Sequence, residues 1–205
     1  MACRGRAAVG RDGMGLVLAS GSPRRQQLLE KAGFDFIAVA PAIEETASIE
    51  LGPQKMCEEN ARQKAAFVAA HRPGSVVLGS DTLVFLEGKP MGKPHTEERA
   101  VEMLNTLSGQ RCTVCTGVAI VHGQQVEQFC ESVDVVFKTF GQETIRDYMC
   151  KVDVLDKAGA FAAQDHAELI IDQIEGDIAT VMGLPLERVT RALAGLGLRP
   201  GKSDS

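Results

Sequence analysis

Two arginines fall in the first turn of a predicted helix, where a positive charge is unfavourable unless an anion binds there. In the stretch LASGSPRRQQLLEKAG, Ser22 is a suitable N-cap and Gly33 a suitable end for the helix. Arg24 and Arg25 then lie at the positive end of the helix dipole. Free N–H groups, hydroxyls and two guanidinium groups in this turn could bind one phosphate together. An ordinary capped helix with two solvated arginines is the alternative, and the spacing alone leaves both open.

Two further clusters combine polar and small residues at predicted strand ends or in loops, where catalytic groups are usually presented. The segment GSDT places Asp81 directly after the apolar strand predicted at 76–78. An aspartate at such an edge can hold a divalent cation or accept a proton from water. The segment DKAG at 156–159 has small residues that let a backbone approach a ligand closely. A turn or cap residue is the alternative for the first cluster, and a surface turn for the second.

Scattered charges could meet around one highly charged ligand. The cations that could neutralise a triphosphate are Arg24, Arg25, Lys64, Lys93 and Lys157. Glu44, Glu45 and Asp81 could hold Mg²⁺ beside it. Each lysine taken alone is more often a solvated side chain, so the interpretation depends on these charges meeting in space. The chain has no G-x-x-x-x-G-K-[ST] or G-x-G-x-x-G segment, which argues against a P-loop or a Rossmann-type site.

Composition is that of an ordinary globular protein. The 205 residues suit one domain, with room for two lobes around a cleft. A net charge of -5 argues against a general nucleic-acid-binding protein, and no apolar run is long enough to cross a bilayer. We therefore expect neither nucleic acid nor a membrane as a partner. Aromatic residues make up only 4% of the chain, so Val, Leu, Ile and Ala must form most of the core.

The cysteines are expected to be buried, reduced thiols of a cytosolic protein. They are Cys3, Cys57, Cys112, Cys115, Cys130 and Cys150. Cys112 and Cys115 form a C-x-x-C in a strand-like run, and a strand sends residues i and i+3 to opposite faces. No second pair completes a zinc site, and the histidines show no H-x-x-x-H spacing. These patterns argue against a zinc hydrolase.

Hydrophobic periodicity and turn signals predict strands that alternate with helices, followed by an antiparallel hairpin. The predicted strands cover residues 15–19, 34–40, 76–78, 113–121, 126–138 and 169–174, with an extended segment at 83–86. The predicted helices cover residues 22–32, 54–71, 96–107, 142–151 and 185–196. This order predicts an α/β fold with a mixed sheet. Residues 1–14 are expected to be a disordered leader or a mis-assigned start, with Met14 as the other candidate initiator. Residues 198–205 are expected to be a frayed tail.

Eight short motifs occur in the order typical of one protein family. They are SGSPRR, IEE, ARQKA, GSDT, GKP, LSG, DKAGAFAAQ and GLPL. Each is weak alone, but together they span residues 16–196, and the chain resembles the Maf family of nucleoside triphosphate pyrophosphatases. The resemblance implies a domain at 15–197 with a fold similar to the inosine triphosphate pyrophosphatases: an α/β mixed sheet with flanking helices and two lobes around a central cleft. It also implies a cytoplasmic homodimer that hydrolyses a nucleoside triphosphate to the monophosphate and pyrophosphate, using Mg²⁺ or Mn²⁺.

The resemblance assigns roles to particular residues. Asp81 matches the catalytic proton acceptor, and Glu45 and Asp81 are expected to hold the metal ion. Ser20, Arg24 and Arg25 match the family's phosphate-binding loop, and Lys64 and Lys93, with Glu45, match other polar residues of its catalytic site. With Ser22 and Lys157, which the turn and charge patterns add, the residues expected to bind substrate phosphates are Ser20, Ser22, Arg24, Arg25, Lys64, Lys93 and Lys157. The positions that distinguish substrate branches are Arg24, Thr82 and Gln164. These three residue types resemble the branch that acts on dTTP and UTP.

Three segments depart from the family's pattern. Cys112 stands where the family usually has histidine, residues 177–181 replace an aromatic-Asn-Val run, and Asp153-Val154 replaces Glu-Pro. These changes spare the charged residues and alter the wall of the expected cleft.

The predicted reaction is a metal-assisted attack of water at the α-phosphorus. Asp81 would act as general base, and the cations would stabilise the leaving pyrophosphate. Two alternatives stay open at this point. One is a nucleotide-binding regulator of cell division without turnover, and the other is a phosphohydrolase that releases orthophosphate.

Overall fold

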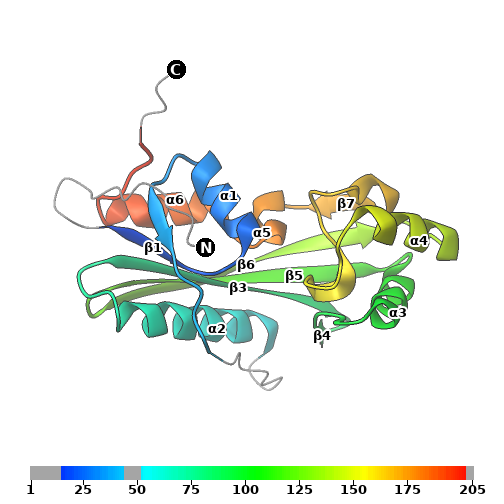
Figure 1. Ribbon diagram of the computed structural model, residues 1–205, viewed down its shortest axis with the longest axis horizontal. Helices are drawn as coiled ribbons and strands as arrows, with labels where there is room; N and C mark the ends of the chain where they lie inside the picture. The colour runs from blue at the N-terminus through cyan, green and yellow to red at the C-terminus, as the bar shows by residue number, and fades with distance from the viewer. Residues whose placement is uncertain (1–14, 44–51, 202–205) are drawn as a thin grey trace.

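A seven-stranded mixed sheet forms the centre of the protein (Figure 1). The computed structural model describes residues 15–43 and 52–201, so the predicted leader lies outside the described residues. The strands are β1 (Leu16–Ala19), β2 (Phe36–Ala38), β3 (Val76–Leu86), β4 (Lys89–Met91), β5 (Arg111–His122), β6 (Gln125–Phe137) and β7 (Ile171–Glu175). Their order is β2-β1-β3-β5-β6-β7, with β4 paired to β3. β1 pairs in parallel with β2 and β3, and the other pairs are antiparallel, which confirms the predicted mixed α/β sheet.

Helices cover both faces of one half of this sheet. Helix α2 (Gly52–Ala69) lies along one face, and α1 (Pro23–Lys31), α5 (Ile178–Met182) and α6 (Leu186–Gly195) lie on the other (Figure 1). Successive side chains of a strand point to opposite faces. In β1, Leu16 and Leu18 therefore pack with α1 and α6, while Val17 and Ala19 pack with α2. The run of small and apolar residues in β1 thus serves two cores.

The long strands β3, β5 and β6 continue into a second lobe with its own core (Figure 1). Helices α3 (Glu97–Leu107) and α4 (Gln142–Lys151) pack there, with short 3-10 helices at Ala158–Ala160 and Ala167–Leu169. Val114 and Val135 of the sheet share this core with Leu104, Tyr148 and Phe161. Thr96 caps α3 as predicted, since its side chain accepts a hydrogen bond from the Arg99 N–H. The same three strands therefore link two cores.

The sequence prediction was wrong about strand β3, which runs without a break past its apolar first residues. Ser80, Asp81 and Thr82 pair with residues of β5 instead of ending the strand. The backbone ladder does not depend on side-chain polarity, so a polar segment inside the sheet stays extended. Strand β4, of three residues, and helix α5, of five, were not predicted.

The end of the described chain lies against the first lobe. Leu198 packs at the edge of the core that contains α1 and α6, and the Gly201 N–H donates to the Gly33 carbonyl at 2.8 Å. The predicted domain boundary at residue 197 stays a prediction. Of the helices within residues 15–43 and 52–201, none is long and apolar enough to cross a membrane.

Candidate active site

A cavity of about 740 Å³ is lined by residues of both lobes. Its wall includes the loop between β1 and α1, the middle of β3, the segment after β4 and the loop before β7. The predicted site residues that line it are Ser20, Ser22, Arg24, Arg25, Lys64, Asp81, Thr82, Lys93, Lys157 and Gln164. Glu44 and Glu45 lie outside the described residues. The fold therefore brings together every predicted site residue that the structure describes.

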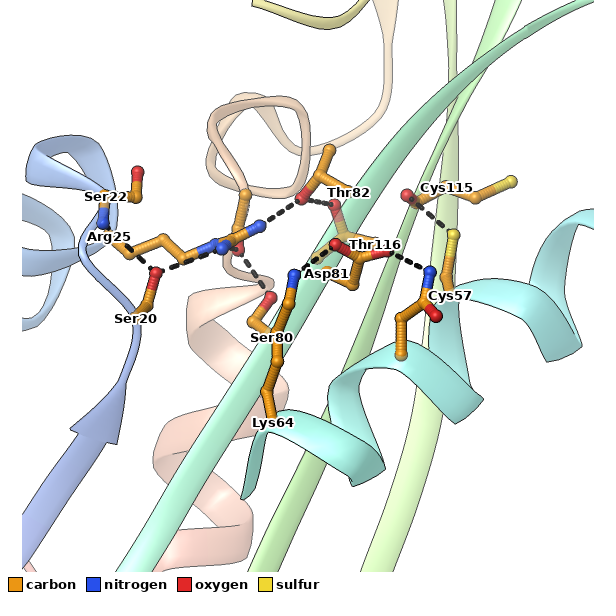
Figure 2. Close-up of polar contacts among 12 residues, drawn as sticks. Ser20, Ser22, Arg25, Cys57, Lys64, Ser80, Asp81, Thr82, Cys115 and Thr116 are labelled. Carbon is orange, nitrogen blue, oxygen red and sulfur yellow. Dashed lines mark hydrogen bonds and ion pairs between the residues drawn. The ribbon is translucent and has the colours of Figure 1, made fainter. Parts of the chain in front are cut away.

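Asp81 is a buried carboxylate held at both of its oxygens. Only 3% of the residue is exposed. Lys64 Nζ donates to Oδ1 at 2.6 Å, and Asn60 Nδ2 donates to Oδ2 at 2.9 Å. Figure 2 shows the Lys64 ammonium reaching Asp81 from α2. The two donors are one helical turn apart, so they share one face of α2. The orientation of the carboxylate is thus fixed by two hydrogen bonds, one of them with an opposite charge.

Two glycines let α2 approach the sheet closely enough for this contact. A Cβ at Gly79 of β3 would lie 2.3 Å from the Ala61 carbonyl oxygen. A Cβ at Gly117 of β5 would lie 2.3 Å from the Cys57 carbonyl group. Side chains at these positions would push the helix away. Gly79, the glycine of GSDT, therefore contributes to the site by letting α2 pack close to β3.

Within the described part of the chain, three acceptors bind the side chain of Arg25. Its Nε donates to the Gly183 carbonyl at 2.9 Å, Nη1 to Ser20 Oγ at 3.1 Å and Nη2 to Thr82 Oγ1 at 3.0 Å. Gly183 follows α5, and the last carbonyls of a helix favour a nearby cation. Figure 2 shows the guanidinium lying between the β1–α1 loop and β3. Arg25, which was predicted to bind a substrate phosphate, is thus held in a fixed position on the cavity wall.

Ser22 occupies the N-cap of α1 as predicted, but its side chain makes no capping hydrogen bond within the described structure. Its backbone N–H instead donates to Ser20 Oγ at 3.2 Å. Ser20 Oγ therefore contacts both the turn and Arg25, which ties the loop to the guanidinium. Of the hydroxyls and guanidinium groups expected to converge here, these contacts bring together those of Ser20 and Arg25, and the shared phosphate site stays a prediction.

The second lobe contributes a charged pair to the cavity wall. Lys157 Nζ donates to Asp156 Oδ1 at 2.7 Å and also to the Asp153 carbonyl. Partial burial acts to raise the pKa of Asp156, but the Lys157 hydrogen bond and charge, with the charge of Arg24, lower that pKa overall. Gln164 Nε2 donates to Asp165 Oδ2 at 3.1 Å. The DKAG segment is therefore part of the pocket and not only a surface turn.

Sequence reasoning missed three contributors to this site. Asn60 could have been found from its i, i+4 spacing to Lys64, which places both on one helix face. Thr116 lies opposite Thr82 in the pairing of β3 with β5, and their hydroxyl oxygens are 2.9 Å apart. Gly183 begins the GLPL motif, but the motif gave no indication that its carbonyl binds Arg25, because that contact depends on the unpredicted helix α5.

The cysteines do not form a metal site among the described residues. Cys57, Cys112 and Cys115 are buried free thiols, as expected. Cys130 is only half-buried and Cys150 is exposed, which corrects the prediction for these two residues. Burial raises the pKa of Cys112 to about 12. A thiol with so high a pKa is unreactive at neutral pH.

The donor set suits a magnesium ion only together with a ligand. Within residues 15–43 and 52–201, no three His, Cys, Asp or Glu side chains are arranged to hold a metal ion. Asp81 and Asp156 are the carboxylates that line the described part of the cavity. Mg²⁺ is usually bound by one or two carboxylates and by substrate phosphates, so Asp81 fits this role.

Fold and cavity together define an α/β protein with a cation-lined pocket that holds a buried carboxylate. The family described as "Maf-like protein" matches residues 15–196, and the chain belongs to this family. It is 46% identical over 184 residues to a dTTP/UTP pyrophosphatase of Akkermansia muciniphila, covering 90% of this chain and 97% of that protein. It is 42% identical over 178 residues to a dTTP/UTP pyrophosphatase of Halalkalibacterium halodurans, covering 87% and 94%.

A solved structure supports the fold independently of close sequence identity. The Staphylococcus aureus Ham1 protein superposes with a TM-score of 0.50 at 17% identity. The superposition covers 89% of this chain and 99% of that protein. The likeness confirms the predicted fold.

Proposed function

We propose that this protein hydrolyses dTTP and UTP to the nucleoside monophosphate and pyrophosphate. The observation that carries the proposal is the buried carboxylate of Asp81 in a cavity that is also lined by Arg24, Arg25 and Lys93. A triphosphate carries several negative charges, which such cations neutralise. Relatives at 46% and 42% identity are named dTTP/UTP pyrophosphatases, and this supports both the reaction and the substrates.

Asp81 is the proposed general base. Its two oxygens are oriented by Lys64 and Asn60, so the carboxylate stays in one position while a water molecule is deprotonated. The cations of the β1–α1 loop, with Lys93 and Lys157, are proposed to bind the phosphates and stabilise the leaving pyrophosphate. Asp81 and Glu45 are the proposed ligands of Mg²⁺ or Mn²⁺. A bound divalent cation would polarise phosphoryl oxygens and neutralise their charge.

Three residues are proposed to distinguish the nucleobase. Arg24, Thr82 and Gln164 line the cavity. A site built from polar groups rejects a base that leaves those groups unpaired, so small changes in these side chains can change the preferred nucleotide. A cytoplasmic homodimer is proposed as the working form.

The decisive experiment is a substrate panel with the reaction product identified. The purified protein is incubated with dTTP, UTP, CTP, dATP and GTP in the presence of Mg²⁺, and pyrophosphate and orthophosphate are measured separately. The proposal expects pyrophosphate release, fastest from dTTP and UTP. Orthophosphate as the first product would identify a different phosphohydrolase. Nucleotide binding without any product would identify a regulator that binds nucleotides without turnover.

A further inference from the structure

A chain of hydrogen bonds runs from Arg25 to the backbone of α5 through two threonines. Figure 2 shows its first part, from Arg25 through Thr82 to Thr116. Arg25 Nη2 donates to Thr82 Oγ1 at 3.0 Å, and Thr82 Oγ1 lies 2.9 Å from Thr116 Oγ1. Thr116 Oγ1 in turn donates to the Thr180 carbonyl at 2.7 Å. Thr116 is fully buried and is not among the described residues that line the cavity. Its hydroxyl contacts the cavity lining at Thr82, and its bond to the Thr180 carbonyl contacts α5, whose Val181 and Met182 also line the cavity.

The groups at the two ends of this series of hydrogen bonds determine which group donates in each bond. A guanidinium group can only donate, and a carbonyl oxygen can only accept. Thr116 has one hydroxyl proton, which it gives to the Thr180 carbonyl. The contact between the two hydroxyls is then a donation from Thr82 to Thr116. Thr82 consequently accepts from Arg25 and has no proton left for a ligand.

We propose that Thr116 is a positioning residue of the pocket. Thr116 accepts the proton of Thr82, and this orients Thr82 so that a lone pair of its hydroxyl oxygen faces Arg25. Thr82 can then accept from the guanidinium together with Ser20 and the Gly183 carbonyl. The inference deepens the proposed function and rests on it only in assigning a substrate phosphate to Arg25. It also means that Thr82 can contact a nucleobase only as an acceptor from an N–H group.

Removing the Thr116 hydroxyl leaves the proton of Thr82 without its acceptor. A donor without an acceptor destabilises the position from which Thr82 accepts the hydrogen bond of Arg25. Arg25 keeps its bonds to Ser20 and to the Gly183 carbonyl, so the guanidinium is loosened and not lost. The expected consequence is weaker binding of an anion by a pocket whose fold is unchanged.

The test measures binding of inorganic pyrophosphate with Mg²⁺ by calorimetry, and hydrolysis of dTTP by pyrophosphate release. Thr116→Val keeps the side-chain shape, and we expect Kd for pyrophosphate and KM for dTTP to rise about three- to tenfold, with kcat changed less than about twofold. Thr82→Val removes the hydrogen bond to the charged Arg25 directly, and we expect it to raise Kd for pyrophosphate about tenfold. The double variant is no weaker than Thr82→Val alone, because Thr116 acts through Thr82. Thr116→Ser keeps the hydroxyl and stays within about twofold of the parent.

Thr113→Val is the matched control. Thr113 lies on the same strand, and its hydroxyl donates to Asp134 at 2.8 Å, away from the cavity. Its loss should leave pyrophosphate binding and turnover unchanged. An unchanged Kd in folded Thr116→Val, or losses that add in the double variant, overturns the proposal. If Thr116→Val does not fold, Thr116→Ala provides the same comparison with less bulk.

The two readouts separate this inference from the proposed function. A protein that binds pyrophosphate but releases none from dTTP contradicts the proposed activity, and the binding series then decides the role of Thr116 alone. Failure of the parent protein to bind pyrophosphate overturns the assignment of Arg25 and the inference with it.

Discussion

Lys64 Nζ lies 2.6 Å from Asp81 Oδ1, and the two residues are only 8% and 3% exposed. The pair joins helix α2 to the middle of strand β3, across the face where Gly79 and Gly117 let the helix approach. Breaking a buried ion pair on one side is costly, because the remaining charge is left without a partner. The contact therefore holds both the helix and the carboxylate in place, and the proposed reaction depends on that carboxylate.

Asp81→Asn should abolish turnover while the protein stays folded. The amide cannot accept a proton from water, and general-base catalysis is typically worth about 10²–10⁴ in rate. Pyrophosphate release from dTTP with Mg²⁺ measures the loss, and circular dichroism checks the fold. Because Asp81→Asn leaves the Lys64 charge buried, Asp81→Asn/Lys64→Gln is the control that removes both charges. Turnover at the parental rate in folded Asp81→Asn would mean that another group accepts the proton.

Asn60→Leu should lower kcat about tenfold and leave KM for dTTP within about twofold. Leucine matches the shape of asparagine but cannot donate to Asp81, and a hydrogen bond to a charged group is worth about 1.5–3 kcal/mol. Steady-state kinetics on dTTP give the two parameters. The matched control is Asn105→Leu, since Asn105 is an exposed residue of helix α3 that donates to the Val101 carbonyl. A loss in KM instead of kcat would place Asn60 in substrate binding and not in orienting the base.

Much of the fold could be predicted because its larger elements carry strong local signals. Helix α4 was predicted with the observed bounds, Gln142–Lys151, and the hairpin of β5 and β6 was recognised from its turn. The failure at Asp81 has a physical cause. A polar residue in a sheet is stabilised by backbone pairing and by partners from another element, here Lys64 and Asn60, and neither is visible in a local window.

The sequence could predict which residues line the candidate site, but not the hydrogen bonds that they make. The order of motifs identified Arg25 and Thr82 as site residues, and both line the cavity. The sequence could not indicate that Arg25 is bound by protein acceptors, because one of them, the Gly183 carbonyl, comes from residue 183, distant in the chain. Side-chain types and spacing thus predict which residues meet, while hydrogen-bond partners depend on the packing of elements that carry no signal of their own.

Gly183→Ala should weaken the hydrogen bonds that hold Arg25 in place. Gly183 has φ 110, a backbone conformation that side chains disfavour, and a Cβ there would lie 3.0 Å from Arg25 Nε and 3.2 Å from Thr82 Oγ1. The backbone strain alone costs about 1–3 kcal/mol, and displacement of Arg25 should raise KM for dTTP several-fold. Urea denaturation and kinetics measure the two effects.

Gly123→Ala is the control that separates backbone strain from steric contact with Arg25. Gly123 also has a positive φ, of 59, but a Cβ there has no neighbour within 4 Å. It should lose stability without any change in KM. If both variants raise KM equally, the contact with Arg25 does not matter for binding.

Removing divalent metal should stop the reaction without destabilising the protein. Chelation with EDTA is expected to abolish pyrophosphate release, and Mg²⁺ or Mn²⁺ should restore it. The described carboxylates form no metal cage, so Mg²⁺ alone should not change Tm, whereas Mg²⁺ with a non-hydrolysable dTTP analogue should raise it. Thermal melts without metal, with Mg²⁺ alone and with Mg²⁺ plus the analogue test this. A Tm raised by Mg²⁺ alone would mean that a complete metal site exists before substrate binds.

Tyr148 should ionise only near pH 12. The residue is fully buried, and the Ala162 N–H donates to its hydroxyl oxygen at 2.8 Å. Burial, and to a smaller extent the negative charges of Asp165 and Glu168, raise the pKa of Tyr148 to about 12, against the lowering effect of the hydrogen bond with the Ala162 backbone. An unfolded tyrosine has a pKa of about 10. The neutral hydroxyl therefore contributes stability that is fully present below pH 10 and is lost as the pH rises toward 12.

The composition makes this titration direct, since the chain has one tyrosine and no tryptophan. The ultraviolet absorbance of the phenolate should appear with a midpoint near pH 12 in buffer and near pH 10 in concentrated urea. Tyr148→Phe should lose about 1–3 kcal/mol at neutral pH, because the Ala162 N–H loses its acceptor. Its stability should then fall less steeply than that of the parent between pH 10 and 12. A phenolate midpoint near pH 10 in the folded protein would mean that solvent reaches the hydroxyl, and the core of the second lobe would then be open at α4.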